Sequence, residues 1–510
     1  MSNRRLDVLF VEADSSKKAY QGLSNVYSAI ETPTWSLLLA QSCRSKGFGV
    51  AIMDCGAEKL TDEEGIKRIA DLNPRLVLFV GYGQNPNSGT ASMIGIERMS
   101  AALREAHPEF TSAVVGSHVS ALPQEVLAFP SIDIVLIGEG VYALHHLLSS
   151  KLDKHDLKSV AGIGFKDTEG NLILTSAGII VPSDRMDIDL PGYAWDLLPF
   201  KDKPLDLYRS HFWHAEFSHE KRTPFAAVYT SLGCRFACNF CMINIINRTS
   251  TTEGAVSADS RDMRYWTPQF MLGEFEKLAK MGVQTLRISD EMFFLDKRYY
   301  EPLLNGIIDR DLNFRMWSYS RVDTVRKEFL QLFKKAGINW LALGIEAGNQ
   351  AVRKEVSKGS FQDVNIREVV KEVRGHDINV ISNYVFGFPE DTKESMQQTL
   401  DLALELNTEM VNMYPCQALP GSPLYNIAKE KSWKLPGSYA GYAFLSYESE
   451  PLPTNHLSAA EVIKFRDQAF QTYFSHEPFL KLVETKFGQQ ERKNVEEMAK
   501  IRLQRKILGD

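Results

Sequence analysis

The chain has 510 residues, a length that predicts two or three domains rather than one hydrophobic core. Hydrophobic residues make up 44% of it and charged residues 24%, as in ordinary globular proteins. The formal net charge of -6 gives no electrostatic reason to expect nucleic-acid binding, and no apolar run reaches the roughly eighteen residues that a membrane span needs. Six sparse cysteines fit a reducing cytoplasm and not a disulfide scaffold.

Residues 1–148 alternate short apolar runs with amphipathic stretches, which predicts a doubly wound, Rossmann-like parallel sheet. The basic start followed by an apolar run is too short for a signal peptide and predicts the first strand. The expected strands are Asp7–Val11, Val50–Asp54, Leu76–Val80, Ala113–Val115 and Ile134–Ile137, and the expected helices include Thr34–Lys46, Glu63–Leu72 and Ile94–Ala106.

Small and neutral polar residues follow the third, fourth and fifth of these strands, at the edge where such a sheet binds its ligand. Glycines there allow a bulky ligand to approach the backbone, and Ser, Asn and Gln offer neutral hydrogen bonds. None of these loops is a G-x-G-x-x-G or Walker sequence, which argues against a dinucleotide or ATP. The candidate ligand-binding residues are Tyr82, Gly83, Gln84, Asn85, Gly116, Ser117, His118, Ser120, Gly138, Glu139 and Gly140.

Residues 149–222 are expected to form a connector that contains a β-hairpin over Ile163–Thr175 and a proline-rich extended segment. Its histidines His211, His214 and His219 match no metal-binding spacing, so a structural or substrate-facing loop is the favoured interpretation.

Residues 223–445 return to strand–helix alternation, which predicts a partial, open (β/α)6 barrel. Polar residues follow several of its strands, at the ends where parallel α/β barrels gather their chemistry. Residues 446–510 are expected to be helical, ending in a charged amphipathic helix over Arg492–Lys506. The expected barrel strands are Phe225–Ser231, Thr285–Ser289, Arg315–Ser318, Leu341–Ile345, Asn379–Val385 and Val411–Cys416.

Three of the six cysteines, Cys234, Cys238 and Cys241, stand at C-x3-C-x2-C spacing directly after the first barrel strand. Three close thiolates can hold an iron–sulfur cluster, and in a [4Fe–4S] cluster they leave one iron open to a small molecule. The alternative, a zinc site, needs a fourth protein ligand, and no His or Cys follows within thirty residues.

This run, with Phe240 before its last cysteine, resembles the signature of the radical S-adenosylmethionine (SAM) superfamily. The resemblance implies that the three cysteines bind a [4Fe–4S] cluster, that SAM binds its open iron, and that reductive cleavage of SAM yields a 5′-deoxyadenosyl radical. It also implies SAM contacts. These are Phe240 near the adenine, Asp290 after the second strand, Ser318 and Arg321 near the methionine carboxylate, Glu346 in Gly344–Asn349, and Asn383 near the adenosyl group.

The N-terminal part resembles the cobalamin-binding domain that precedes many radical SAM enzymes, through Glu31–Pro33, Gly116–Pro123 and Gly138–Gly140. The resemblance implies that the candidate loops listed above hold the corrin and its nucleotide tail. It departs in one respect, because Glu12–Ser16 contains no histidine of a D-x-H-x-x-G motif. His118 could replace that cobalt ligand, but a hydrogen-bonding role within its loop is favoured. A flavodoxin-like domain without cobalamin is the alternative for the whole region.

The resemblance therefore implies a cobalamin-dependent radical SAM enzyme, and we expect a C-methyltransferase that methylates an unactivated carbon of a small molecule through the 5′-deoxyadenosyl radical and methylcobalamin. A rearrangement, cyclisation or epimerisation is the alternative within enzymes, and a B12-sensing protein with an inactive barrel is the alternative outside them. Cys416 is a candidate hydrogen donor, although a small core residue is the favoured interpretation. An electron donor such as flavodoxin or ferredoxin is the expected protein partner.

Overall fold

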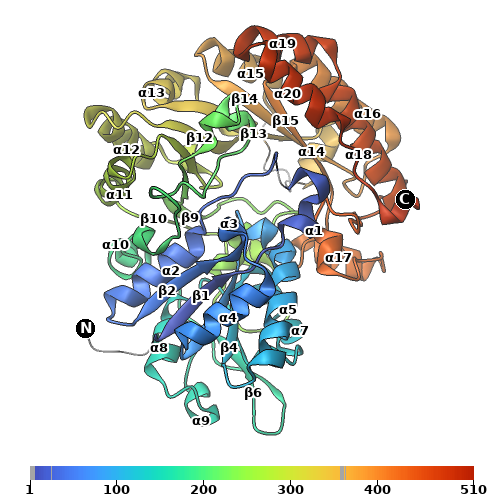
Figure 1. Cartoon of the computed structure of the whole chain (residues 1–510). Helices are drawn as coiled ribbons and strands as arrows, with labels where there is room; N and C mark the ends of the chain where they lie inside the picture. Colours follow the sequence, from blue (N-terminus) through green and yellow to red (C-terminus); the bar gives the residue numbers. More distant parts are fainter. Residues whose placement is uncertain (1–5, 25, 357–360, 362) are drawn as a thin grey trace.

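The computed structural model describes residues 6–24, 26–356, 361 and 363–510. Two large sheets organise this part of the chain, a seven-stranded one followed by a six-stranded one. The N-terminal domain (blue in Figure 1) lies beneath the second sheet and its helices (green to orange), and the C-terminal helices (red) cover one side of that second sheet. The predicted succession of a Rossmann-like domain, a partial barrel and a helical region is thereby confirmed.

The first sheet is parallel from β1 to β5 and has the strand order β2-β1-β3-β4-β5. Each of these strands lies within one residue of its predicted position: β1 (Val8–Glu12), β2 (Val50–Asp54), β3 (Leu76–Gly81), β4 (Ser112–Gly116) and β5 (Ile134–Leu136). The order reverses between β1 and β3, the place where doubly wound sheets bind their ligands. The main helices are α1 (Ser16–Tyr20), α2 (Thr34–Ser45), α4 (Asp62–Leu72), α5 (Gly89–Ala106), α6 (Ser117–Ala121), α7 (Pro123–Leu127) and α8 (Val141–Ser149).

A hairpin of β6 (Ile163–Lys166) and β7 (Leu172–Leu174) extends this sheet. β6 pairs antiparallel with β5, so the first sheet continues into the segment where we expected a connector. The physical reason is that β5 would otherwise be an edge strand, with unpaired backbone N–H and C=O groups.

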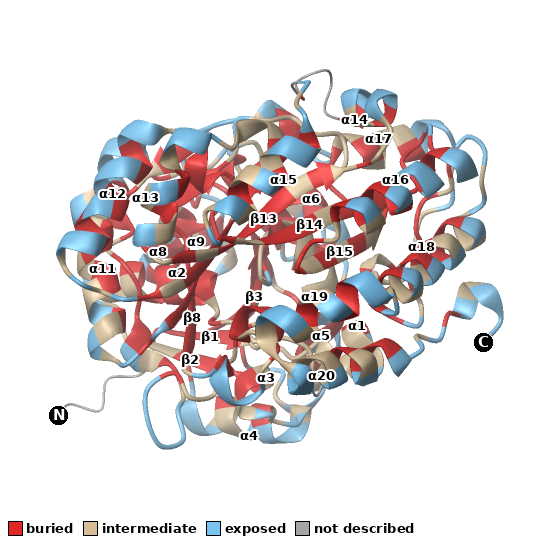
Figure 2. Cartoon of the chain, turned by 90° about the horizontal axis from the view of Figure 1, so that it is seen from above, coloured by how far each residue is buried: buried red, intermediate tan, exposed pale blue. Residues whose placement is uncertain are grey.

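The second sheet contains six parallel strands in sequence order and stays open. Buried strands face helices on the outside, and the exposed helix surfaces form the outer rim (Figure 2). The strands are β8 (Phe225–Val228), β11 (Thr285–Ile288), β12 (Arg315–Arg321), β13 (Ile338–Glu346), β14 (Asn379–Phe386) and β15 (Met410–Pro415). The helices that follow them include α11 (Pro268–Lys280), α12 (Lys297–Asp309), α13 (Leu330–Lys335), α15 (Ile366–Gly375) and α16 (Lys393–Leu406).

Side chains from other parts of the chain cover both edges of this open sheet. At the β8 edge, the Thr32 hydroxyl accepts the N–H of Ala227 at 2.9 Å and lies 3.2 Å from its carbonyl oxygen. At the β15 edge, Arg466 Nε donates to the carbonyl of Met413 at 2.6 Å. Arg466 belongs to α18 (Ala459–Phe474), so the N-terminal domain and the C-terminal region each close one edge of the barrel.

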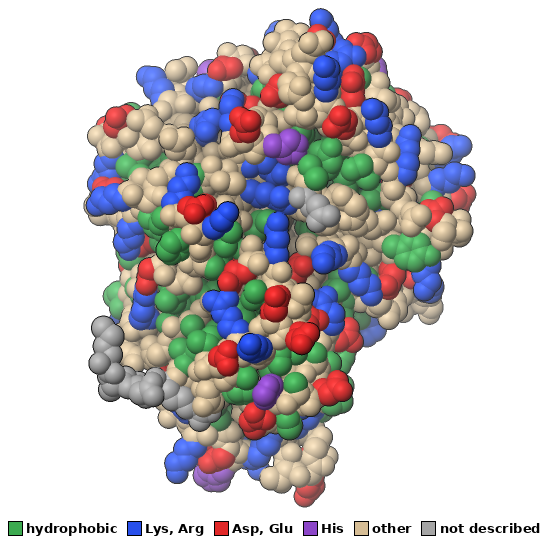
Figure 3. Space-filling view, viewed as in Figure 1, with side chains coloured by type: hydrophobic (Ala, Val, Ile, Leu, Met, Phe, Trp, Pro, Cys, Tyr) green, Lys and Arg blue, Asp and Glu red, His purple; other side chains and the backbone are tan. Residues whose placement is uncertain are grey.

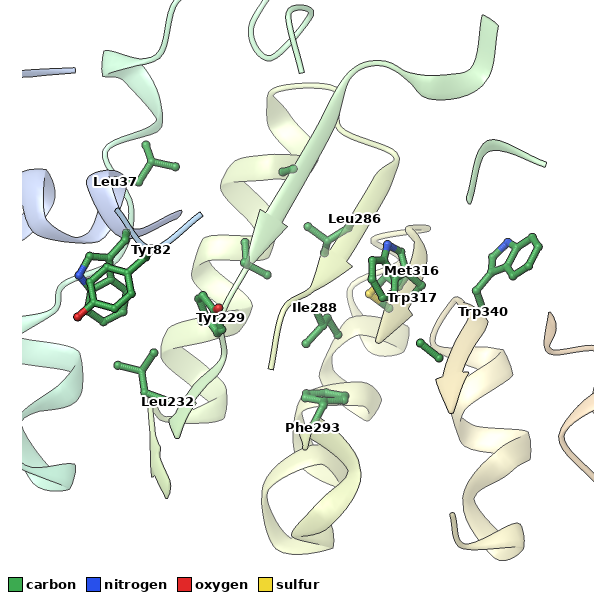
Figure 4. Close-up of a cluster of buried hydrophobic side chains, with 14 of the residues drawn as sticks. Leu37, Tyr82, Tyr229, Leu232, Leu286, Ile288, Phe293, Met316, Trp317 and Trp340 are labelled. Atoms are coloured by element: carbon green, nitrogen blue, oxygen red, sulfur yellow. The ribbon is translucent and has the colours of Figure 1, made fainter. Parts of the chain in front are cut away.

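Large aromatic side chains fill the barrel away from its carboxyl end. The ring of Trp213 lies 5.0 Å from that of Trp317 and 5.2 Å from that of Trp340, measured between centroids. Figure 4 shows Trp317 and Trp340 on neighbouring strands, beside Leu286 and Ile288. This packing fills the barrel on the side of β12 and β13, and Trp213 and Trp317 also line the cavity described below. The chemistry of parallel α/β barrels gathers at the carboxyl ends of their strands.

The C-terminal region contains α18, α19 (Glu477–Phe487) and α20 (Gln489–Lys500). The predicted helix over Arg492–Lys506 is wrong in its last residues, since α20 ends at Lys500. Arg505 is instead fully buried, and its guanidinium donates to Asp467 and to the carbonyls of Phe444 and Ser446. These bonds hold the chain in a non-helical course. No helix in the described part of the chain combines the length and apolar character of a membrane span.

Candidate active site

One cavity of about 1090 Å³ lies where the two sheets meet. Its walls come from the carboxyl ends of the barrel strands, the cysteine loop, the loop after β3, α1, α18 and the segment that follows α20. All three cysteines of the predicted cluster motif line this cavity. The cysteine motif, the strand ends and a loop of the N-terminal domain therefore meet at one cavity.

The cysteine loop follows the short strand β9 (Ser231–Gly233). Asn244 holds its start, because its side-chain oxygen accepts the N–H of Cys234 at 2.7 Å. All three thiols are free and half-buried, and burial raises the pKa of Cys234 to about 12 and that of Cys238 to about 11. Thiolates in such a place need nearby positive charge, which bound iron ions supply. The donor set and its environment thus fit a metal cluster.

Asn87, in the loop after β3, contacts the cysteine loop directly. Its Oδ1 accepts the N–H of Met242 at 2.9 Å, and its Nδ2 lies 3.7 Å from the sulfur of Cys241. The N-terminal domain therefore reaches a predicted cluster ligand. Asn87 was not among the predicted site residues, although it stands in the polar loop that the sequence singled out.

Four of the predicted SAM contacts line the cavity: Phe240, Arg321, Glu346 and Asn383. Arg321 Nη2 donates to Asp323 at 2.6 Å, and its guanidinium lies 3.8 Å from the ring centroid of Phe236 in the cysteine loop. Asn383 donates to the carbonyl of Leu343 and accepts from Asn412, so its amide has a fixed orientation.

Two carboxyl groups face the cavity with perturbed acidity. Burial raises the pKa of Glu346 to about 7, against the opposing effect of Arg321, and burial raises the pKa of Glu291 to about 8. Oε1 of Glu291 is buried without a hydrogen-bond partner among the described residues. A cationic or hydrogen-bonding ligand group would satisfy it. Glu291 was missed as a site residue, although its place after a barrel strand was a usable signal.

Asp290 and Ser318, also predicted to contact SAM, do not line the cavity. Asp290 is fully buried, and its carboxylate accepts from the backbone and hydroxyl of Thr230 and from the hydroxyl of Ser231. These bonds hold the start of the cysteine loop, which is a supporting role. Ser318 is fully buried within β12, on the side of the strand opposite to Trp317 and Tyr319.

Of the predicted cobalamin contacts, Gln84 and Asn85 line the cavity. Most of the others form hydrogen bonds within the N-terminal domain, beneath the cavity. Tyr82 donates to the carbonyl of Gly138, and the Ser120 hydroxyl accepts the N–H of Gly138 at 2.9 Å and donates to the carbonyl of Gly116 at 2.7 Å. Ser117 donates to the carbonyl of Pro86 at 2.6 Å. These contacts shape the loop edge, and the remaining predicted residues Gly83 and Gly140 have positive φ angles there.

Glu139 forms a buried ion pair with Arg264 at 2.7 Å, with both side chains 1% exposed. Arg264 lies on β10 (Met263–Tyr265), which pairs with β9 and so supports the cysteine loop. Glu139 also accepts the N–H of Val181. The structure thus places Glu139 in a link between the N-terminal domain and the barrel, away from the cavity.

Both ring nitrogens of His118 are engaged within the N-terminal domain. Nδ1 lies 3.2 Å from the Thr90 hydroxyl, and Nε2 lies 3.0 Å from Glu125. His118 is 1% exposed and does not line the cavity, which agrees with the favoured hydrogen-bonding role. In the connector, His211 lines the cavity, with Nε2 2.9 Å from Glu31.

Cys416 follows β15 and lines the cavity, although it is only 1% exposed. Burial raises the pKa of its thiol, so the sulfur keeps its proton at neutral pH. Its place is compatible with both of the roles considered from the sequence, and its role as hydrogen donor stays a prediction.

Comparisons with known proteins agree with this arrangement. The family model described as "Radical SAM superfamily" matches residues 228–403, and that described as "B12 binding domain" matches residues 21–148. The "Uncharacterized methyltransferase PH0819" of Pyrococcus horikoshii is 22% identical over 447 residues, which cover 87% of this chain and 88% of that protein. The "Anaerobic magnesium-protoporphyrin IX monomethyl ester cyclase" of Synechocystis sp. is 24% identical over 390 residues, which cover 76% and 70%.

A solved structure shares the fold at low sequence identity. It is the radical S-adenosylmethionine methyltransferase TsrM of Kitasatospora setae, with tryptophan substrate and a SAM analog bound. The TM-score is 0.65 at 15% identity, with 92% of this chain and 89% of that chain covered. The chain is a radical SAM enzyme with an N-terminal B12-binding domain, and its cofactors are a [4Fe–4S] cluster, SAM and cobalamin.

Proposed function

We propose that this enzyme transfers a methyl group from SAM to an unactivated carbon of a small molecule. The observation that carries the proposal is the shared cavity, because the cysteine loop, polar barrel residues and the loop after β3 of the B12-binding domain all line it. Two of the three proteins compared above carry the name methyltransferase. Methyl transfer between SAM, a cobalt carrier and a substrate carbon requires that all of these groups share one space.

Different residues of the chain would bind the different cofactors. Cys234, Cys238 and Cys241 would hold the cluster, and Glu346 and Arg321 would hold the polar end of SAM through opposite charges. When bound, the cluster supplies the electron that cleaves SAM, and cobalamin supplies a cobalt ion able to carry a methyl group. Gln84 and Asn85 would contact cobalamin at the edge of the first sheet.

Positioning and the exclusion of water are the main contributions of the protein. The aromatic packing around Trp317 fills the barrel on the side of β12 and β13, and Asn383 and Asn412 fix one another across β14 and β15. A radical carbon reacts with whatever lies near it, so the groups that the cavity wall places beside it select the product.

A second candidate function uses the same cofactors for a cyclisation or another rearrangement without methyl transfer. The observation that favours it is Cys416, whose protonated thiol lines the cavity and could return a hydrogen atom to a substrate radical. The cyclase similarity over 76% of this chain points the same way. A thiol hydrogen donor is unnecessary when the substrate radical accepts a methyl group.

The test begins with anaerobic purification from cobalamin-fed cells and measurement of iron and cobalt in one sample. About four irons and one cobalt per chain are expected. The protein is then reduced with flavodoxin or ferredoxin, our proposed electron donors, and supplied with SAM that carries a deuterated methyl group. Methyl transfer predicts S-adenosylhomocysteine together with 5′-deoxyadenosine. 5′-Deoxyadenosine alone, with an extract-derived substrate that gains no deuterium, would favour the rearrangement.

A further inference from the structure

The cavity continues away from the cysteines along the inner face of β15. The side chains of Met410, Asn412 and Tyr414 line it in turn, followed by Cys416. A strand rises about 3.3 Å per residue, so the wall from Met410 to Cys416 is about 20 Å long. The space beside the SAM-binding end can therefore take an extended molecule.

Apolar side chains form the wall at the far end of this space. Met410 is the first residue of β15, and Leu23 comes from the N-terminal domain. Met498 lies near the end of α20, and Ile501 and Leu503 belong to the segment that follows this helix. These groups offer no hydrogen bonds. They favour the hydrocarbon part of a ligand through the hydrophobic effect.

Basic side chains outnumber acidic ones on the part of the cavity wall that α18 and the segment after α20 form. Arg466 and Arg505 share the single carboxylate of Asp467, at 2.8 Å each. Lys464 and Arg502 also line the cavity, are exposed, and have no carboxylate partner in the part of the chain that the structure describes. Figure 3 shows Lys and Arg side chains interspersed with Asp and Glu side chains on one face of the molecule. The local excess of positive charge attracts an anion.

We infer that the part of the cavity between β15, α18 and the segment after α20 binds a substrate with an apolar body and an anionic group, a carboxylate or a phosphate. The apolar body lies along β15 and the anionic group meets Lys464 and Arg502. The inference rests on the proposed function, since it treats the SAM-binding end of the cavity as the reaction site.

The test is isothermal titration calorimetry of the cofactor-loaded enzyme with dodecyl phosphate, dodecanoate and dodecyltrimethylammonium, each below its critical micelle concentration. At least one of the two anions is expected to bind tenfold or more tightly than the cation. The comparison of phosphate with carboxylate identifies the anionic group. The double variant K464Q/R502Q is expected to lose about tenfold in affinity for the anion. M410W places a larger side chain in the apolar part of the cavity and is expected to lose binding of the ligand's alkyl chain.

The matched control is K371Q/R261Q, which removes an exposed lysine and an exposed arginine outside the cavity. Equal affinity for anions and cation, or equal loss in the control and K464Q/R502Q, would overturn the inference. Iron, cobalt and SAM cleavage are measured in the same preparation. Anion binding without cobalt or SAM cleavage would refute the proposed function and leave the binding site in place.

A second, independent observation concerns the contact of Asn87 with Cys241. The backbone N–H of Met242 can only donate, so it fixes the amide oxygen of Asn87 on its own side. The amide nitrogen then faces the sulfur of Cys241, 3.7 Å away, and can donate to it. The donor comes from the B12-binding domain and the acceptor is a cluster ligand.

The geometry points to Asn87 as a residue that raises the reduction potential of the cluster. A hydrogen bond to a ligand sulfur stabilises the reduced cluster, which carries the greater negative charge, and such bonds are among the factors that set cluster potentials. Asn87 follows Gln84 and Asn85, which line the cavity, so the same loop serves the cobalamin and cluster ends of the site.

The test is a redox titration of the reconstituted cluster followed by electron paramagnetic resonance, which needs neither cobalamin nor substrate. N87A is expected to lower the reduction equilibrium constant about tenfold, or about 59 mV for one electron. N87D, which keeps an acceptor for Met242 but no amide donor, is expected to lower it at least as much. The control is N239A, because the amide of Asn239 donates to the carbonyl of Glu355 and, among the residues that the structure describes, to no sulfur. An unchanged potential in both Asn87 variants, or the same shift in N239A, would overturn this role.

Discussion

Replacing Glu139 by leucine tests whether this residue links the domains, as its contacts indicate, or contacts cobalamin, as its sequence position predicted. The variant leaves Arg264 buried at 1% exposure without its counter-charge. Removal of one partner of a buried ion pair costs about 3–5 kcal/mol. Arg264 keeps bonds to the carbonyl of Val181 at 2.7 Å and to Asn247 at 2.9 Å, so we expect the lower part of that range.

The assay is urea unfolding of the cofactor-free protein, with fluorescence and circular dichroism followed together. The double variant E139L/R264M removes both charges and is expected to recover much of the lost stability, because an apolar pair of similar volume often replaces a buried ion pair without loss. The control is E63Q on the exposed surface of α4, which is expected to change the unfolding free energy by less than about 0.5 kcal/mol.

Cobalamin binding separates the two interpretations. If Glu139 only supports the interface, folded E139L/R264M is expected to bind cobalamin with nearly the affinity of the unaltered chain. If E139L leaves the unfolding free energy unchanged and weakens cobalamin binding tenfold or more, the reasoning from the buried ion pair is refuted.

Four further outcomes are expected. The iron content of C241A should fall well below about four irons per chain, and SAM cleavage should be lost. An unchanged iron content would disprove the role of Cys241 as a cluster ligand. The affinity for SAM should rise between pH 6 and 8 as Glu346, with its pKa near 7, becomes ionised, and equilibrium dialysis should find E346Q nearly independent of pH. Burial raises the pKa of Glu12 to about 8, so between about pH 4.5 and 8 this carboxyl group ionises in the unfolded chain but stays protonated in the folded one. The free energy of unfolding therefore falls as the pH rises through this range, and urea unfolding should show the largest stabilisation by E12Q at pH 8. C416A should retain methyl transfer within about twofold, whereas a selective loss of product with SAM cleavage intact would favour the hydrogen-donor role.

Much of the architecture was predictable because local patterns encode it. The alternation of apolar runs and amphipathic stretches identified every strand from β1 to β5 within one residue, and the cysteine spacing identified the predicted cluster ligands before any geometry was known. Both signals are short in sequence. Side chains two, three or four residues apart decide strand and helix faces, and three thiols within eight residues must lie close together.

The sequence by itself determined the two domain types, their order and the metal-binding motif. Only the tertiary structure decided which polar loop residues face the cavity. Glu139 and His118 stand in glycine-rich loops at strand ends, yet Glu139 pairs with Arg264, 125 positions away, and His118 with Thr90 and Glu125. Whether such a group contacts a ligand or another residue of the chain depends on which distant segment folding brings beside it. The local sequence does not reveal that contact.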